Sequence, residues 1–385
     1  MTTSGAHGFG TRAIHAGEAA DPATRAHATP IYQTATFAFE TGELKEEVVD
    51  RAMAWEPESY FYTRTQNPTT DALERKVASL EGAEAAVACA SGMAAVSTTV
   101  LSLLSAGDHC VASDDVFIIT RFLLDDVLAR KGIEVTRVDV RDLDAVRAAM
   151  RPSTRAVFVE SLSNPHLHLA DVAALAELAH GADATLVVDN TFLSPALFRP
   201  LEHGADLVLH SATKYLAGHG DTVCGVVSGS RALTDPIRYE LDALGGAVGP
   251  FGSWLVARGI RTLPLRIDAH TRNATAVAGL LAARPEVDHL SYPGHPSHPQ
   301  HPLAQRLLPR GSGGMLSFRL SGGVDAMYAF TNALELAAIG VSLGDLKTLA
   351  YPMPKRGDLI RLSVGCEDVE DVLADVERGL AAVGR

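Results

Sequence analysis

A lysine and two hydroxyl side chains follow a short apolar segment near the middle of this 385-residue chain. Residues 207–209 (LVL) have the composition of a buried strand, and Ser211, Thr213 and Lys214 come shortly after it. Parallel α/β sheets bind their ligands at the carboxyl ends of their strands. Hydroxyl groups there suit phosphate oxygens, and a partly desolvated lysine suits Schiff-base formation with a carbonyl compound. The segment therefore predicts a lysine that attaches pyridoxal phosphate (PLP), which carries both groups.

An aspartate ends a second apolar segment upstream. Residues 184–190 read ATLVVDN, with Asp189 at the end of the expected strand. A carboxylate against the pyridine nitrogen of PLP keeps that nitrogen protonated, so that the ring can accept electrons from the substrate Cα. Asp189 alone would suit a turn, and Lys214 alone would suit the surface. Their combination favours a PLP site.

Residues 91–93 (Ser91, Gly92, Met93) lie between an expected strand at 85–89 and a helix that reaches about residue 104. The free N–H groups and the dipole of a helix N-terminus bind anions, and Gly92 lets the backbone approach closely. The side chain of Met93 is expected to pack, so that only its N–H contacts the ligand. We predict that this turn binds the cofactor phosphate.

Several segments together resemble the Cys/Met-metabolism PLP-dependent enzymes. These segments are TRTQNPT, SGMAA, VVDNTF, HSATKYLAGHGD and RLSVGCED, and the match runs from about residue 11 to the C-terminus. The family includes cystathionine γ-synthase, cystathionine γ-lyase, methionine γ-lyase and the O-acylhomoserine sulfhydrylases, and the chain looks most similar to methionine γ-lyase. The resemblance implies a PLP-dependent transferase fold of type I and a homotetramer built from dimers that share their active sites.

The resemblance also assigns cofactor contacts. Tyr62 and Arg64 match residues that bind the cofactor phosphate of the neighbouring subunit, although Arg64 alone would read as a solvated loop charge. Asn164 matches an amide that bonds the cofactor ring oxygen. Phe117 occupies the position of a tyrosine that stacks on the ring. We expect Phe117 to act with Lys214 and Asp189 in the catalytic set.

Two further residues match the substrate-binding positions of the family. Arg361 falls on the arginine that binds the substrate α-carboxylate, a role that suits the bidentate fork of a guanidinium. Ser342 matches a residue at the border of the same pocket.

The sequence departs from the family at positions that concern the substrate. Ile119 stands where methionine γ-lyases carry a cysteine, and Ala243 and Leu244 replace a Lys-Asp pair. Lys347 stands where many relatives carry a glutamate that faces the distal end of the substrate, and residues 349–361 form an unusually short loop. These changes predict that methionine and cystathionine are poor substrates.

We expect γ-elimination on a γ-substituted L-α-amino acid. A γ-replacement enzyme of the cystathionine γ-synthase or sulfhydrylase type, a β-eliminating lyase and a non-catalytic PLP-binding relative are the alternatives. Phe117 lacks the hydroxyl that usually helps the γ-group to depart. Either the leaving group is stable as an anion, such as a halide or the carboxylate of an acyloxy group, or another side chain or a water supplies the proton.

The elements that position these residues follow an alternating strand–helix pattern, which predicts an α/β fold with a mostly parallel, seven-stranded type of sheet. We divide the chain into an N-terminal arm (1–60), a PLP-binding large domain (61–255) and a smaller α+β C-terminal domain (256–385). The extended segment 28–39 cannot bury itself alone and is expected to pack on another subunit. The expected strands are 85–89, 109–112, 134–138, 156–160, 184–190, 207–209, 287–292, 315–320 and 359–363. The expected helices include 43–53, 70–80, 120–131, 142–150, 171–180, 264–283, 326–336 and 369–383.

Composition limits the possible partners. The formal net charge of −13 argues against binding to nucleic acid or to an anionic membrane. The four cysteines are scattered without metal-ligand spacing, and His166 and His168 lack a third ligand, so we expect reduced thiols and no metal site. No apolar stretch reaches membrane-spanning length, and residues 1–10 lack a signal-peptide core. These features predict a cytoplasmic protein.

Overall fold

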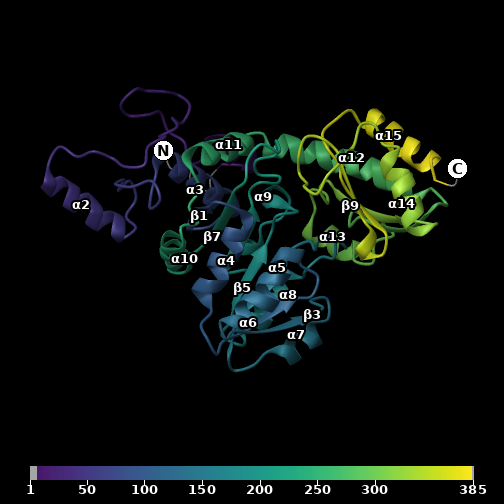
Figure 1. The fold of residues 1–385 in the computed structure, drawn as a ribbon, viewed down its shortest axis with the longest axis horizontal. Helices are drawn as coiled ribbons and strands as arrows, with labels where there is room; N and C mark the ends of the chain where they lie inside the picture. The colour runs from purple at the N-terminus through teal and green to yellow at the C-terminus, as the bar shows by residue number, and fades with distance from the viewer. Residues whose placement is uncertain (1–6, 384–385) are drawn as a thin grey trace.

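The computed structural model describes residues 7–383, and its larger sheet has seven strands (Figure 1). Every neighbouring pair is parallel except the two pairs of β7, which is antiparallel to both β1 and β6. The prediction of a mostly parallel α/β sheet is therefore confirmed. The order across the sheet is β1 (Ala85–Cys89), β7 (Gly225–Gly229), β6 (Leu207–Ser211), β5 (Thr185–Asp189), β4 (Thr154–Glu160), β2 (His109–Ser113) and β3 (Glu134–Val138).

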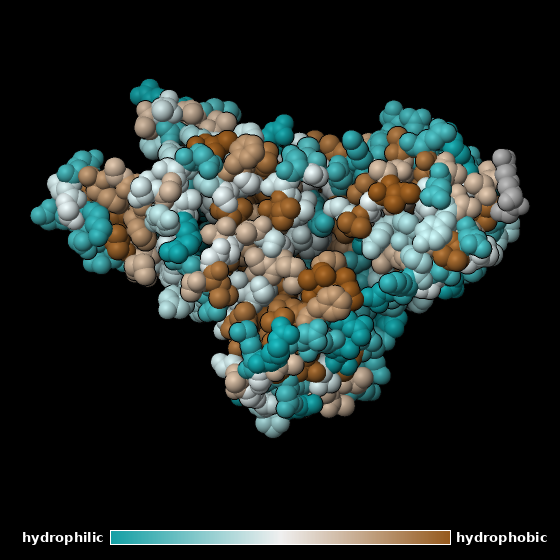
Figure 2. Space-filling model, viewed as in Figure 1, coloured by the Kyte–Doolittle hydropathy of each residue, from teal (hydrophilic) through white to brown (hydrophobic). Residues whose placement is uncertain are grey.

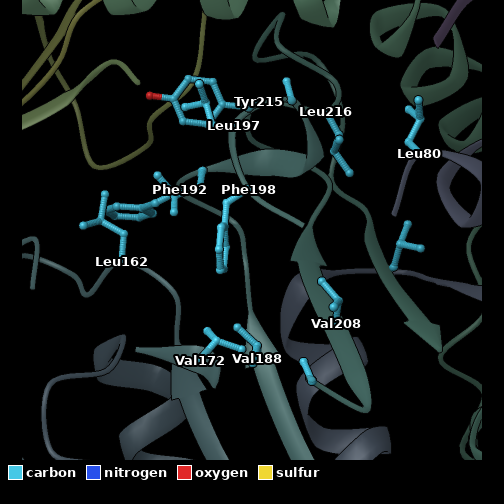
Figure 3. Close-up of a cluster of buried hydrophobic side chains, with 14 of the residues drawn as sticks. Leu80, Leu162, Val172, Val188, Phe192, Leu197, Phe198, Val208, Tyr215 and Leu216 are labelled. Atoms are coloured by element: carbon cyan, nitrogen blue, oxygen red, sulfur yellow. The ribbon is translucent and has the colours of Figure 1, made fainter. Parts of the chain in front are cut away.

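Side chains of these strands alternate between two cores. Along β4, Val157 belongs to one buried cluster and Phe158 to the other. Figure 3 shows Val188 and Val208 of two adjacent strands in one cluster with Val172 of α8 (Val172–His180). Because helices cover both faces, the strands are apolar at nearly every position, which explains their continuous apolar segments.

The connecting helices confirm most of the expected boundaries. One expectation is wrong in detail: the helix predicted at 120–131 is a helix, a π-helical turn and another short helix in succession. The helices of this part of the chain are α3 (Pro68–Glu81), α4 (Gly92–Leu103), α5 (Ile118–Phe122), η1 (Leu123–Val127, the π turn), α6 (Leu128–Arg130), α7 (Leu143–Ala149), α9 (Ser194–Leu197), α10 (Arg231–Leu244) and α11 (Pro250–Ile260).

The C-terminal part forms a second, five-stranded sheet with its own core. Its order is β10 (Ala338–Ile339), β11 (Leu349–Met353), β12 (Leu359–Ser363), β9 (Met315–Leu320) and β8 (Val287–Ser291). The helices α12 (Leu263–Ala282), α14 (Gly323–Asn332) and α15 (Val369–Ala381) contribute to this core (Figure 1). The buried residues of α13 (His301–Leu307) belong instead to a core of the large sheet.

Strand β11 corrects an expectation, because its residues were assigned to a loop. Pro352 obscures the strand pattern, since proline cannot donate to a sheet ladder. The structure accommodates it because β10 pairs only with Leu349 and Ala350, which leaves the outer side of Pro352 without a neighbouring strand.

The N-terminal arm extends away from the body (Figure 1). Its helix α2 (Gly42–Met53) matches the expected one, whereas α1 (Phe9–His15) was not foreseen. Lys76 of α3 holds α1 by donating to the carbonyls of Ala13 (3.0 Å) and Ile14 (3.1 Å). The limits of the arm and of the two domains, at residues 60 and 255, stay predictions.

Across residues 7–383, no helix combines the length and the apolar character that crossing a bilayer requires.

Candidate active site

A cavity of about 760 Å³ lies between the carboxyl ends of β4, β5 and β6 and the strands β11 and β12 of the smaller sheet. Segments far apart in the sequence meet there. The cavity wall brings together ten of the residues singled out from the sequence: Ser91, Gly92, Met93, Phe117, Asn164, Asp189, Ser211, Thr213, Lys214 and Arg361.

Lys214 lies in the turn after β6, and its Nζ donates a hydrogen bond to Oγ of Ser342 (2.8 Å). Ser342 therefore borders the site, as expected. Burial, and after it the positive charge of Arg361, lower the pKa of the Lys214 ammonium. A lowered pKa increases the share of neutral amine, which is the form that acts as a nucleophile and as a base.

Asp189 ends β5 with its carboxylate at the cavity. Its Oδ1 accepts hydrogen bonds from the backbone N–H (3.0 Å) and the hydroxyl (2.5 Å) of Thr191. Burial raises the pKa of Asp189, and the bonds from Thr191 oppose part of that rise. A buried carboxylate of this kind suits a cationic partner, such as a protonated ring nitrogen.

Glu160 is a site residue that the sequence analysis missed. It ends β4 in register with Asp189 of β5, and it lines the same cavity. Its carboxylate accepts the backbone N–H groups of Phe117 (2.7 Å) and Asn164 (3.1 Å). Burial, and then the charge of Asp189, raise its pKa well above the ordinary value. The sequence did contain a signal for Glu160, because Glu160 ends an apolar segment just as Asp189 does.

The N-terminus of α4 faces the cavity and fits a phosphate group. The hydroxyl of Ser91 caps the helix by accepting the N–H of Ala94 (3.0 Å), while the first two N–H groups, of Gly92 and Met93, have no carbonyl partner within a helix. A Cβ atom at position 92 would lie 2.7 Å from Cβ of Ser211. This close packing explains the glycine and holds Ser211 beside the free N–H groups.

Arg361 is a buried cation at the cavity wall. Its guanidinium donates to Oδ1 of Asn164 (2.8 Å) and to the carbonyls of Val341 (3.0 Å) and Ser342 (3.2 Å). Within the described residues its buried Nε has no partner. Burial lowers its pKa to about 10, so the group is still charged at neutral pH. A guanidinium in the cavity wall suits a carboxylate.

Five predicted site residues are not part of this cavity wall: Ser342, which contacts Lys214, and Tyr62, Arg64, Ile119 and Lys347. Arg64 has an ion pair with Asp242 (2.9 Å) and a 53% exposed side chain, and it lies over the ring of the exposed Tyr62. Ile119 and Lys347 are both exposed. An exposed apolar set gathers around α5 (Figure 2). It consists of Phe117, Ile118, Ile119 and Phe122. Of these, Ile118 lines the cavity and Ile119 does not, against the prediction.

Lys347 was predicted to face the distal end of the substrate. Val341, and not Lys347, belongs to the cavity wall. A repulsion between Lys347 and the distal ammonium of cystathionine therefore has no basis within one chain.

His166 and His168 both contact the carboxylate of Asp115, at 2.8 and 3.2 Å. In the part of the chain from residue 7 to residue 383, no group of three or more His, Cys, Asp or Glu side chains is placed to hold a metal ion.

Comparisons with known proteins agree with this geometry. A family model described as "Cys/Met metabolism PLP-dependent enzyme" matches residues 10–381. The chain is 44% identical to L-methionine gamma-lyase of Pseudomonas putida, over 97% of this chain and 98% of the relative. It is 42% identical to cystathionine gamma-synthase of Mycobacterium bovis, over 98% and 97% of the two chains. The crystal structure of metB from Corynebacterium glutamicum superposes with a TM-score of 0.91 at 39% identity, covering 98% of both chains.

Proposed function

Since this chain belongs to the Cys/Met metabolism PLP-dependent enzymes, with PLP as its cofactor and the α/β fold of that family, we propose that it catalyses γ-elimination on a γ-substituted L-α-amino acid. When bound, PLP supplies an electron sink conjugated to the substrate Cα. The residues of the cavity fit it: a phosphate suits the N-terminus of α4, and a ring nitrogen suits Asp189. The finer statements below concern this chain's own side chains.

One observation carries the proposal: Lys214 and Arg361 line the same cavity. Arg361 is suited to hold the α-carboxylate, and this fixes the Cα of an amino acid near the lysine. Lys214, whose amine has a lowered pKa, is then the base that removes the Cα proton. The Nδ2 group of Asn164 is left to donate to a ring oxygen, because its Oδ1 already accepts from Arg361.

Elimination is favoured over replacement because the relative at 44% identity and five more at 41–42% are named L-methionine gamma-lyases. Replacement is the second candidate, since an O-succinylhomoserine sulfhydrylase and a cystathionine gamma-synthase are each 42% identical to the chain. The test is product analysis with a panel of γ-substituted amino acids, with and without an added thiol. Elimination gives a 2-oxo acid and ammonia without the thiol. Products that form only when the thiol is present would establish replacement instead.

The leaving group is proposed to be one that is stable as an anion, a halide or an acyloxy carboxylate. Phe117 lines the cavity without a hydroxyl, and a general acid is typically worth about 10²–10⁴-fold. We therefore expect the wild type to release chloride from a γ-chloro amino acid much faster than a thiol from the matching γ-thioether.

The variant Phe117→Tyr tests this explanation. Its new hydroxyl should accelerate the thioether reaction by about 10²-fold or more and leave chloride release nearly unchanged. Phe117→Leu serves as the control for lost ring stacking, and it should slow both substrates alike. If the wild type processes both analogues at equal rates, the anionic leaving group is wrong.

We propose further that the protein is a homotetramer whose active sites are shared within dimers. Tyr62 and Arg64 do not line the cavity that holds Lys214 of their own chain, as expected if they serve a neighbouring subunit. Under subunit exchange, inactive Arg64→Ala and Lys214→Ala proteins should together regain about one quarter of wild-type activity, because mixed dimers keep one intact site.

A matched mixture provides the control for this experiment. Lys214 and Asp189 lie in the same cavity of one chain, so Lys214→Ala mixed with Asp189→Asn should regain nothing. Equal behaviour of the two mixtures, once exchange is verified by mass, would show that Arg64 serves its own chain.

A further inference from the structure

The proposed γ-elimination needs a proton at the far end of the substrate. The Cγ–X bond breaks with its electron pair on X, a base takes a Cβ proton, and the pair of that Cβ–H bond becomes the second bond between Cβ and Cγ. The pair left by the Cα proton then becomes the second bond between Cα and Cβ, while the second pair between Cβ and Cγ forms a new Cγ–H bond, which requires a proton donor near Cγ. Phe117 has no proton to give, and the carboxylates of Glu160 and Asp189 accept hydrogen bonds within the site.

Tyr351 offers a hydroxyl in this cavity. Among the residues of the described chain that line it, Tyr351 is the only tyrosine. It belongs to β11, a strand that the sequence pattern concealed. Its side chain is half-buried in the cavity wall, so a ligand in the cavity can contact it.

The register of the small sheet places Tyr351 beside the group proposed to hold the substrate. Tyr351 is the direct cross-strand partner of Arg361, so both side chains leave the sheet on the same face. The guanidinium carbon of Arg361 lies 5.2 Å from the centre of the tyrosine ring. Since Cγ of an amino acid is three bonds from its carboxylate carbon, a side chain next to the carboxylate site is within reach of Cγ.

The strand that carries Tyr351 is held firmly. At its start, Thr348 donates through its hydroxyl to Glu367 (2.9 Å) and accepts the N–H of Gly365 (2.9 Å). The whole of β11 pairs with β12, and Ala350 is buried in the core of the small sheet. A catalytic acid needs such fixed placement to transfer a proton efficiently.

We propose that Tyr351 is the general acid that protonates Cγ of the substrate. Its hydroxyl proton forms the Cγ–H bond with the electron pair described above, and water returns a proton to the resulting phenolate. The proposal rests on the proposed γ-elimination and adds the residue that completes it. The same ring also packs against Arg361, so the test has to remove the hydroxyl and keep the ring.

The variant Tyr351→Phe in the PLP-loaded enzyme meets that requirement. With a γ-chloro amino acid in a single turnover, we expect chloride release at the wild-type rate and 2-oxo acid formation slowed by about 10²-fold or more. Rapid-scan absorbance should show a visible-absorbing species that persists only in the variant. Binding of an unreactive amino acid, L-norvaline, should be unchanged, because the ring still packs on Arg361.

Tyr328→Phe is the matched control, since Tyr328 lies on α14 outside the cavity and is 42% exposed. It should behave like the wild type in both measurements. Unchanged 2-oxo acid formation in Tyr351→Phe would overturn the role of Tyr351, as would an equal loss of chloride release. Failure of the wild type itself to release chloride or a thiol from any γ-substituted amino acid would instead overturn the elimination.

Discussion

The Lys214→Ala protein will fold and bind PLP without a covalent bond, and its turnover will fall by at least about 10⁴-fold. One positioned acid–base group alone supplies about 10²–10⁴-fold, and Lys214 is proposed to serve both as the nucleophile that attaches the cofactor and as the base at Cα. Its half-buried Nζ contacts Ser342 and no carboxylate, so its removal breaks no ion pair. We therefore expect a melting temperature close to that of the cofactor-free wild type.

The measurement is turnover together with mass spectrometry after borohydride treatment. Borohydride should fix the cofactor on the peptide that contains Lys214 in the wild type and on no peptide in the variant. Lys347→Ala is the matched control, because Lys347 is exposed and does not line the cavity. A labelled peptide other than that of Lys214, or an active Lys214→Ala protein, would refute the assignment.

The sequence was sufficient to predict the candidate residues that lie at the ends of apolar strands. Lys214 and Asp189 each follow an apolar segment, and the parallel sheet places the carboxyl ends of β5 and β6 side by side. The helix start proposed to bind phosphate was likewise predictable, because the cap Ser91 and the glycine Gly92 are local features of the sequence. Local patterns identify residues that one element positions by itself.

Residues positioned by pairing between distant elements were harder to find. Glu160 ends an apolar strand, but its place beside Asp189 depends on the register between β4 and β5, which no local pattern shows. Tyr351 enters the cavity because β11 pairs with β12, yet a proline conceals β11. In both cases the missing information is a strand register, which depends on contacts far apart in the chain.

Aligning Ile119 with the cysteine of methionine γ-lyases does not determine which way its side chain points. Ile119 was expected at the cavity, but α5 is five residues long and continues into a π turn. The helix presents Ile118 to the cavity, and Ile119 lies in the exposed apolar set around α5. A shift by one residue rotates a helical side chain by about 100°, so that neighbouring residues face different surroundings.

The Asp189→Asn protein will be a much poorer catalyst and, without cofactor, a more stable fold. Asparagine is nearly isosteric, and its Oδ1 can still accept both bonds from Thr191. The variant cannot hold a proton on the ring nitrogen by charge, so we expect a loss in kcat of about 10²–10⁴-fold. The loss of activity and the gain in stability have the same cause, because both come from removing a carboxylate that is partly desolvated by burial.

The sign of the stability effect follows from the pKa shift. Burial raises the pKa of Asp189 above its unfolded-state value of 3.8. Folding therefore opposes ionisation, and the penalty is absent below the unfolded pKa, grows as the pH rises, and is complete above the folded pKa. The charge of Asp189 also raises the pKa of Glu160, so removing that charge relieves a repulsion between the two groups. Removing the charge should stabilise the cofactor-free fold at neutral pH and have little effect near pH 4.

Urea unfolding of the cofactor-free proteins between pH 4 and 8 provides the measurement. The difference in unfolding free energy between variant and wild type should increase with pH, by at most about 1.4 kcal/mol per pH unit. Asp144→Asn is the control, because the Asp144 side chain is 91% exposed and its removal should give no such slope. A difference that is flat with pH, or that favours the wild type at pH 7, would mean that Asp189 is held charged by the protein alone. The carboxylate would then need no cofactor cation, and its proposed pairing with the ring nitrogen would lose its physical basis.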